Sequence, residues 1–365
     1  MAMKLSIVGC GLMGGGIAID AARHGIGVRV YDTRPESTDD LHRRAAGVYA
    51  RWVKNGRMTQ EAARASLARI APTGTLAEVG DADLIIEAIF EDLTLKRGLM
   101  AALAQHLGPD TIVATNTSAL RVGAIAEDLT FADRVLGLHY FSPAEVSPLV
   151  EVVRAPHTSE VAVARALTFL TETRRTPLPC ADSPGFAINR FFCPYYNEAV
   201  RLVEDGLATP SEVDVVARER LGVAAGPFTV LNLIGLRVAS RAMENLASLG
   251  PFYAASSELL VRADRNTPYS IADDATVPES SDLIEDRLVA ALAVPALELL
   301  EEGVAGREET DRGAVMALKF ERGPYALIRS YPVTRVGAAI EAICKRYQHP
   351  PPSADTIGSV LSNVD

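Results

Sequence analysis

Long apolar runs, paired cysteines and an excess of positive charge are all lacking in this sequence of 365 residues. No apolar run reaches the roughly 18 residues that a membrane-spanning helix requires. The four cysteines are scattered, without a CxxC pair or a metal-ligand spacing, so we expect buried free thiols and no metal site. The short apolar run at the N-terminus leads straight into glycines, which is typical of a first strand and not of a signal peptide. These absences predict a cytoplasmic protein without membrane contact.

The charge balance excludes a further class of function. The formal net charge is −10, whereas proteins that bind the phosphates of DNA or RNA present a basic stripe. We therefore expect no nucleic-acid partner. Hydrophobic residues make up 48% and charged residues 22% of the chain, which is ordinary for a globular protein, and the length suits two domains.

Short apolar segments alternate with helical patterns in the first half of the chain. We expect strands at 4–8, 27–32, 83–89, 111–115, 134–140 and 149–154, a helix at about 14–24, and a helical pair at about 36–69. The alternation is typical of a doubly wound, Rossmann-like α/β sheet in which helices connect parallel strands. Strand patterns end near Asp182, so we expect this domain to cover residues 1–182 and an all-α domain to cover residues 183–365.

The second half of the chain contains similar segments at a spacing of 97 residues. This constant spacing favours a duplicated helical unit, with copies at about 183–261 and 281–365 joined by the polar stretch 262–282. The landmarks are residues 198–206 with 295–303, Asp214 with Asp311, and Gly226-Pro227 with Gly323-Pro324.

A glycine motif follows the first expected strand. Gly9-Cys10-Gly11-Leu12-Met13-Gly14 has the GxGxxG spacing, a helical pattern follows it, and the second strand ends in Asp32. The first glycine permits a tight turn, the second lets the backbone approach a pyrophosphate, and the third lets the helix pack against the strand. The helix N-terminus attracts phosphates, and Asp32 would bind ribose hydroxyls, which favours NAD over NADP. Arg34 could instead grip a 2′-phosphate.

Four further motifs follow in order: Thr115-Asn-Thr-Ser118, Gly137-Leu-His-Tyr-Phe-Ser-Pro143, Leu149-Val-Glu-Val152 and Asp182-Ser-Pro-Gly-Phe-Ala-Ile-Asn189-Arg190. With the glycine motif and Ile86–Leu93, they resemble L-3-hydroxyacyl-CoA dehydrogenases over residues 3–240. The duplicated unit resembles the dehydrogenase portion of multifunctional fatty-acid oxidation proteins, which extends the resemblance to nearly the whole chain. The resemblance implies NAD-dependent oxidation of an L-3-hydroxyacyl thioester, with a short acyl chain favoured, or the reverse reduction.

The resemblance also implies roles for single residues. His139 would take the hydroxyl proton, because imidazole titrates near neutral pH, and Glu151 would hold its other ring nitrogen. Ser118 and Asn189 match positions that hydrogen-bond the 3-oxygen of the substrate. The positions that line the cofactor are matched by Asn116, Glu91 and Lys96. The last two could equally be a solvated pair at a helix start.

The chain departs from the family beside the expected base. The family has His-Phe-Phe-Asn-Pro where this chain has His139-Tyr-Phe-Ser142-Pro, so a shorter hydroxyl side chain replaces the amide that orients the substrate. Ser142 could be a neutral change, or it could mark a smaller or more polar acyl group. In the second copy, Asp286-Arg287 stands where the first copy has Asn189-Arg190, so we expect that copy to be structural.

The carrier of the acyl group is left open at this point. The helical pair has a local excess of basic residues, among them Arg51, Lys54 and Arg57, which suits the phosphates of CoA. The same excess suits an acidic acyl carrier protein, or forms a solvated helical face. The first alternative function is therefore the same chemistry on a hydroxyacyl or glyceryl unit held by an acyl carrier protein in polyketide biosynthesis.

Two more alternatives differ in class. A sugar-acid dehydrogenase of the L-gulonate type would share the first domain but not the tandem repeat. A non-catalytic NAD-binding structural protein would have no reason to keep Ser118, His139, Glu151 and Asn189 together. Because single-copy relatives dimerise through the helical domain, a second copy could replace the partner. We expect a monomer, or a homodimer through the helical domain, that needs no partner to complete its fold.

Overall fold

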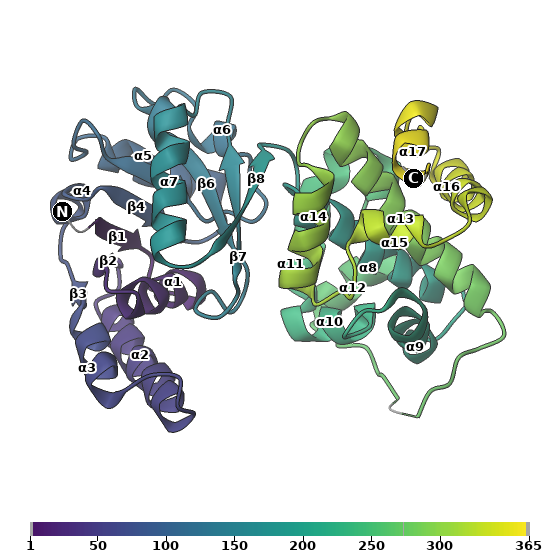
Figure 1. Ribbon diagram of the computed structural model, residues 1–365, viewed down its shortest axis with the longest axis horizontal. Coiled ribbons are helices and arrows are strands. Elements are labelled where there is room, and N and C mark those ends of the chain that lie inside the picture. The colour runs from purple at the N-terminus through teal and green to yellow at the C-terminus, as the bar shows by residue number, and fades with distance from the viewer. Residues whose placement is uncertain (1–2, 273, 363–365) are drawn as a thin grey trace. The chain divides into compact units, whose positions relative to one another are not determined.

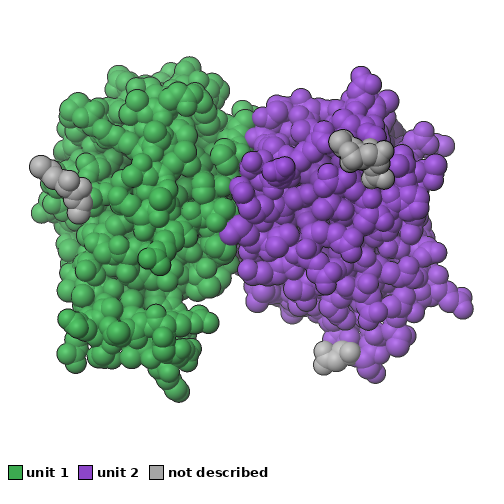
Figure 2. All heavy atoms as spheres, viewed as in Figure 1, with its two compact units in different colours: residues 1–182 green, residues 183–365 purple. Residues whose placement is uncertain are grey.

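The computed structural model describes residues 3–272 and 274–362, and the chain divides into two compact units, residues 1–182 and residues 183–365 (Figure 1, Figure 2). Unit 1 contains an eight-stranded sheet in the order β3-β2-β1-β4-β5-β6-β7-β8. The strands are β1 Lys4–Val8, β2 Gly27–Tyr31, β3 Ile70–Pro72, β4 Leu84–Glu87, β5 Ile112–Thr115, β6 Val135–Tyr140, β7 Leu149–Arg154 and β8 Thr176–Ala181. The helices are α1 Leu12–Arg23, α2 Glu36–Lys54, α3 Gln60–Ala68, α4 Leu76–Gly80, α5 Leu93–Leu103, α6 Val122–Ile125 and α7 Glu160–Glu172.

One strand pair departs from the parallel pattern predicted for this sheet. β6 and β7 are antiparallel, whereas the other neighbouring strands are parallel. Residues 141–148 alone connect them, which is too short for the helical crossover that a parallel pair needs. The edge strands β3 and β8 were not predicted. β8 contains Pro177 and Pro179, and an edge position tolerates prolines because one side of the strand has no partner strand.

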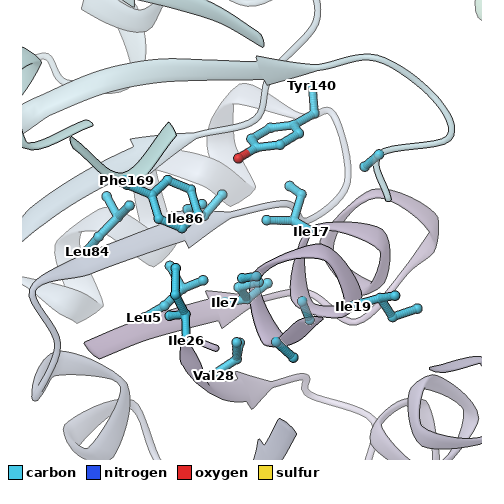
Figure 3. Packing of buried hydrophobic residues seen from close by; sticks show 14 of the residues in the cluster. Leu5, Ile7, Ile17, Ile19, Ile26, Val28, Leu84, Ile86, Tyr140 and Phe169 are labelled. Atoms are coloured by element: carbon cyan, nitrogen blue, oxygen red, sulfur yellow. The ribbon is translucent and has the colours of Figure 1, made fainter. Parts of the chain in front are cut away.

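The core of unit 1 lies between the sheet and its helices. The central strands β1, β4, β5 and β6 are buried on both faces apart from Lys4 at the start of β1, which is why apolar residues occupy consecutive positions in them instead of alternating with exposed polar ones. Figure 3 shows Ile17 of α1 and Phe169 of α7 among the strand side chains Ile7 and Ile86. Each such buried side chain contributes about 2 kcal/mol of hydrophobic stabilisation. The strand order reverses between β1 and β4, where doubly wound sheets bind ligands at the carboxyl ends of their strands.

Unit 2 is built from helices. Within its described residues, the only extended pairing is an isolated bridge between Val223 and Phe320. The helices are α8 Ile188–Glu204, α9 Pro210–Leu221, α10 Pro227–Ile234, α11 Leu236–Leu246, α12 Ser257–Arg265, α13 Ser281–Glu301, α14 Arg307–Gly313, α15 Pro324–Arg329, α16 Val333–Tyr347 and α17 Ala354–Leu361. α12 continues to Arg265, so the connection expected to start at residue 262 starts after this helix.

Helix positions in unit 2 recur at the spacing of 97 residues noted in the sequence. Four helices start 97 residues before a later helix: α9 before α14, α10 before α15, α11 before α16 and α12 before α17. Helix α8 likewise ends 97 residues before the end of α13. Asp214 accepts hydrogen bonds from the backbone N–H groups of Phe228 and Thr229 at the start of α10. Asp311 accepts the equivalent bonds at the start of α15. Each aspartate therefore caps the helix that follows the next turn.

Candidate active site

The glycine motif forms a tight turn between β1 and α1. Gly9 has φ +100°, and a Cβ atom there would lie 2.5 Å from the carbonyl oxygen of Ala88, just past β4. A Cβ at Gly14 would lie 1.9 Å from the carbonyl oxygen of Gly9, so α1 can approach the turn only with glycine at this position. At Gly11, by contrast, none of the described atoms lies within 4 Å of a Cβ position. The turn therefore leaves open backbone at its second glycine, where Leu12 and Met13 begin α1.

Asp32 faces this turn from the end of β2. Its Oδ2 atom accepts a hydrogen bond from the backbone N–H of Cys10 at 2.9 Å, and its Oδ1 atom accepts one from the N–H of Arg34 at 3.0 Å. Among the described residues, no side chain caps the N-terminus of α1. These features fit a dinucleotide. Its pyrophosphate would lie against the open backbone at the start of α1, and its ribose would bind the carboxylate of Asp32. Burial, and then the charge of Asp32, raise the pKa of the Cys10 thiol to about 12, so this thiol stays protonated.

A histidine and a glutamate face each other across β6 and β7. His139 and Glu151 are directly opposite in the antiparallel register, which puts both side chains on one face of the sheet. The Nδ1 atom of His139 lies 2.5 Å from Oε2 of Glu151. The histidine is 6% exposed and the glutamate is 0% exposed, so water screens this pair little. The ring of Phe141 lies 4.6 Å from the imidazole, centroid to centroid.

The loop after β5 lies beside this pair. Asn116 accepts a hydrogen bond from the backbone N–H of Tyr140 through its Oδ1 atom at 2.9 Å, and this joins the loop to the strand of His139. Ser118 follows as an exposed residue, and its backbone N–H donates to Oε1 of Glu91 at 3.0 Å. The structure thus brings Asn116, Ser118 and Glu91 together at the carboxyl ends of β4 and β5.

Lys96 is not the solvated residue that one interpretation of the sequence offered. It is 1% exposed, and its Nζ atom lies 2.6 Å from Glu87 and 3.3 Å from Glu91. Glu87 was missed as a site residue. The signal was a carboxylate that ends the apolar strand Leu84–Glu87, since an acid in a strand buried on both faces needs a partner.

A second missed contact joins the glycine turn to the loop that carries Ser142. Arg44 of α2 donates to the carbonyl oxygen of Leu12 at 2.8 Å and to both carboxylate oxygens of Glu145 at 3.0 Å. Ser142 itself is exposed in the connection between β6 and β7. A side chain more than a hundred residues away in sequence from its partner gives no local pattern to detect.

The remaining predicted residues lie elsewhere. Arg51, Lys54 and Arg57 are exposed at the end of α2 and in the turn after it. Asn189 belongs to unit 2, in the first turn of α8. All four cysteines are buried with free thiols, as predicted. Over residues 3–272 and 274–362, no group of acidic, histidine or cysteine side chains could hold a metal ion, and no helix has the length and apolarity to span a bilayer.

Comparison with known proteins agrees with these features. Residues 4–183 match the family model of the 3-hydroxyacyl-CoA dehydrogenase NAD binding domain, and residues 185–267 match that of the C-terminal domain. The chain is 38% identical over 234 residues to 3-hydroxyadipyl-CoA dehydrogenase of Escherichia coli, covering 63% of this chain but only 49% of that protein. It is 35% identical over 245 residues to a probable 3-hydroxybutyryl-CoA dehydrogenase of Bacillus subtilis, covering 67% of this chain and 85% of the relative.

A solved structure extends the likeness of fold to the whole chain. The crystal structure of 3-hydroxybutyryl-CoA dehydrogenase from Escherichia coli K12 superposes with a TM-score of 0.87 at 23% identity, covering 99% of this chain and 98% of that one. The NAD cofactor predicted from the glycine motif agrees with the matched domain. This chain belongs to the 3-hydroxyacyl-CoA dehydrogenase family.

Proposed function

We propose that this protein oxidises an L-3-hydroxyacyl thioester to the 3-ketoacyl thioester with NAD, or catalyses the reverse reduction. The observation that carries the proposal is the buried pair of His139 and Glu151. A carboxylate only accepts hydrogen bonds, so Nδ1 of His139 bears a proton and Nε2 is the ring nitrogen that can take one. Family membership supports the same reaction.

The residues have separate tasks in this reaction. His139 would take the proton of the 3-hydroxyl group as the C3–H bond breaks, and NAD, when bound, supplies the hydride acceptor. The imidazolium that results is stabilised by Glu151, whose charge acts strongly because it is buried. Ser118 and Asn189 would donate hydrogen bonds to the 3-oxygen while its charge changes. Asp32, with both oxygens already fixed by backbone N–H groups, would bind the ribose of NAD and repel the 2′-phosphate of NADP.

The experiment that tests the proposal replaces the two paired residues. His139→Gln should lower kcat for L-3-hydroxybutyryl-CoA about a thousandfold, because it removes the proposed proton acceptor, and Glu151→Gln about a hundredfold. His157→Gln, at an exposed histidine just past β7, is the matched control and should leave kcat unchanged. A His139→Gln enzyme that retains a tenth of the wild-type kcat would contradict the proposal.

Coenzyme A with a short acyl chain is the carrier that we propose first. The exposed basic residues Arg51, Lys54 and Arg57 support binding of its phosphates. The same residues and the exposed Ser142 also support the second candidate, a hydroxyacyl or glyceryl unit on an acyl carrier protein. Arg51→Glu with Lys54→Glu should raise KM for the true carrier and leave KM for NAD unchanged. Comparing kcat/KM for the two carriers distinguishes the candidates.

We further infer that unit 2 is a duplicated helical unit whose two copies pair within one chain. Arg190 pairs with Glu302 at 2.6 Å, and Arg287 pairs with Asp205 at 2.7 Å. Arg190 and Arg287 lie 97 residues apart, and so do Asp205 and Glu302. The arginine of each copy therefore pairs with the acid of the other copy. This reciprocity is the signature of an isologous, two-fold interface.

Other contacts support the same inference. The bridge between Val223 and Phe320 joins residues that are themselves 97 apart, as a two-fold axis through this point requires. Asp286, at the position equivalent to Asn189, is paired with Arg335 at 2.6 Å, which supports a structural role for the second copy. We expect the chain to stay folded as a monomer on dilution. Sedimentation that shows an obligate dimer, unfolding when diluted, would contradict this.

A further inference from the structure

A lysine in unit 1 is buried between two carboxylates. The Nζ atom of Lys96 lies 2.6 Å from Oε1 of Glu87, and both side chains are almost completely buried, at 1% and 0% exposure. Its second partner, Oε2 of Glu91, lies 3.3 Å away on a side chain that is 31% exposed. Removing such charges from water is costly, and apolar residues of similar size often stabilise a fold equally well. The cluster therefore calls for an explanation other than stability.

Glu87 fixes the ends of two neighbouring strands. Besides Lys96, its Oε1 atom accepts a hydrogen bond from the backbone N–H of Ile89 at 2.7 Å. Its Oε2 atom accepts one from the Thr115 hydroxyl at 2.6 Å. Thr115 is the last residue of β5, so the loop that follows starts from a fixed point.

Glu91 holds the next part of this loop. Its Oε1 atom accepts hydrogen bonds from the backbone N–H groups of Ser118 at 3.0 Å and Ala119 at 3.1 Å, and from the Thr117 hydroxyl at 2.5 Å. One carboxylate oxygen thus gathers three donors of the loop, while the other faces Lys96. Hydrogen bonds to a charged acceptor are the stronger kind.

The same loop is joined to the strand of His139. Asn116 accepts a hydrogen bond from the N–H of Tyr140, the residue after His139, so one end of the loop is held by β6. Glu91 holds the other end. The place of Ser118 relative to His139 therefore depends on where Glu91 lies.

We propose that Glu87 is a positioning residue for the reaction. The charge of Glu87 balances that of Lys96 and holds it, Lys96 holds Glu91, and Glu91 sets the place of Ser118 relative to the strand of His139. Without the charge of Glu87, the lysine is not held between two acids, and the partly exposed Glu91 can turn toward solvent and release the loop. The role rests on the proposed function of Ser118 as a donor to the 3-oxygen, where a displacement of about 1 Å can lower the rate about a hundredfold.

Hydrogen–deuterium exchange tests the proposal in the full chain without substrate. Glu87→Gln keeps the shape of the side chain and removes its charge. We expect exchange of the Ser118 and Ala119 amides to accelerate about tenfold. In the same variant, kcat for L-3-hydroxybutyryl-CoA at saturating NAD should fall about tenfold, with KM for the thioester changed less than about threefold, because the donor acts mainly in the transition state. Glu127→Gln is the control and should change neither quantity. It removes one of two exposed acidic partners of Arg97, which follows Lys96 on α5.

A paired variant keeps the test decisive if Glu87→Gln does not fold. Glu87→Leu with Lys96→Met removes both buried charges together, a replacement that folds often tolerate. If the pair served only the fold, this variant would exchange and turn over like the wild type, and that result would overturn the proposal. Faster exchange at Ser118 and Ala119 with unchanged kcat would also overturn it. Exchange is measured without substrate, so a wild type that fails to oxidise the thioester would count against the proposed function and leave the loop result standing.

Discussion

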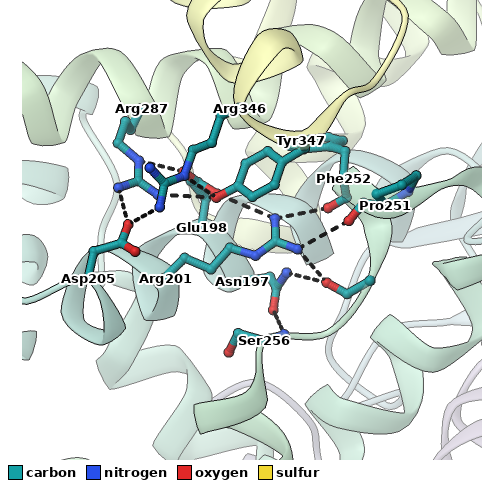
Figure 4. A network of polar contacts seen from close by, with 11 residues as sticks. Asn197, Glu198, Arg201, Asp205, Pro251, Phe252, Ser256, Arg287, Arg346 and Tyr347 are labelled. Atoms are coloured by element: carbon teal, nitrogen blue, oxygen red, sulfur yellow. Dashed lines mark hydrogen bonds and ion pairs between the residues drawn. The ribbon is translucent and has the colours of Figure 1, made fainter.

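Arg287 offers a sharp test of what holds helices α8 and α13 together in unit 2. This arginine of α13 pairs with Glu198 of α8 at 2.5 Å and with Asp205 at 2.7 Å, and it donates to the hydroxyl of Tyr347 (Figure 4). The side chain of Glu198 is 0% exposed, whereas that of Asp205 is 28% exposed. The change to Met keeps the apolar stem of Arg287 and removes its charge.

The loss of stability in Arg287→Met follows from the buried Glu198 carboxylate, which loses its closest cation. Breaking a buried ion pair by removal of one partner typically costs 3–5 kcal/mol, and Arg201 remains 3.6 Å from Glu198, so the low end applies. Asp205 keeps Arg346 as a partner and adds little. We expect Arg287→Met to destabilise unit 2 by about 3 kcal/mol, which lowers Tm by about 8 °C for a unit of this size.

Scanning calorimetry of the full chain measures this shift, and a matched variant controls for charge. Arg346→Met removes the other partner of Asp205, but Arg346 is 44% exposed, and exposed pairs contribute about 0–1 kcal/mol. The Tm of this variant should fall by less than about 3 °C. Equal shifts in Tm for the two variants would contradict this prediction, because they would mean that loss of the Arg287 partner costs the buried Glu198 nothing.

Three further predictions follow from single positions. Gly14→Ala should abolish NAD binding in a fluorescence titration, because the new methyl overlaps the carbonyl oxygen of the first glycine in the turn. Tyr140→Phe should raise the free energy of unfolding by about 1 kcal/mol, since the Tyr140 hydroxyl is buried without a hydrogen-bond partner among the described residues. Burial opposes ionisation of Glu298, but hydrogen bonds from His349 and Tyr253 outweigh it and lower its pKa below the usual 4.5. Ionised Glu298 therefore stabilises the fold above pH about 4.5, and this contribution is lost as the pH falls further. Glu298→Gln should reduce the fall in the free energy of unfolding below this pH.

The sequence predicted the sheet where local pattern decides structure. The mostly apolar segments at 4–8, 111–115 and 149–154 recur as β1, β5 and β7 within a residue of their expected bounds. β8 was not predicted, because its prolines, Pro177 and Pro179, are atypical of strands and are tolerated only at an edge. The antiparallel direction of β7 was also not predicted, although the connection at 141–148 is too short for a parallel pair.

The candidate site also contains residues that a local motif predicts and contacts that it does not predict. Residues within motifs, such as Gly9 and His139, were named from spacing and from resemblance to a family. Contacts that depend on the fold were not, because no local pattern connects Arg44 with Glu145 or Glu87 with Thr115. Burial of Lys96 likewise emerges only when β4 and α5 are packed together.

In the proposed reaction, the buried histidine–glutamate pair removes the hydroxyl proton of an L-3-hydroxyacyl thioester while NAD is reduced. The most direct measurement follows NADH formation by the wild-type chain with NAD and the L or D isomer of 3-hydroxybutyryl-CoA. We expect steady turnover of the L isomer and none above background with the D isomer, because one arrangement of base and donors fits one configuration at C3. Absence of NADH with the L isomer, or equal rates with both isomers, would contradict this role of the histidine–glutamate pair.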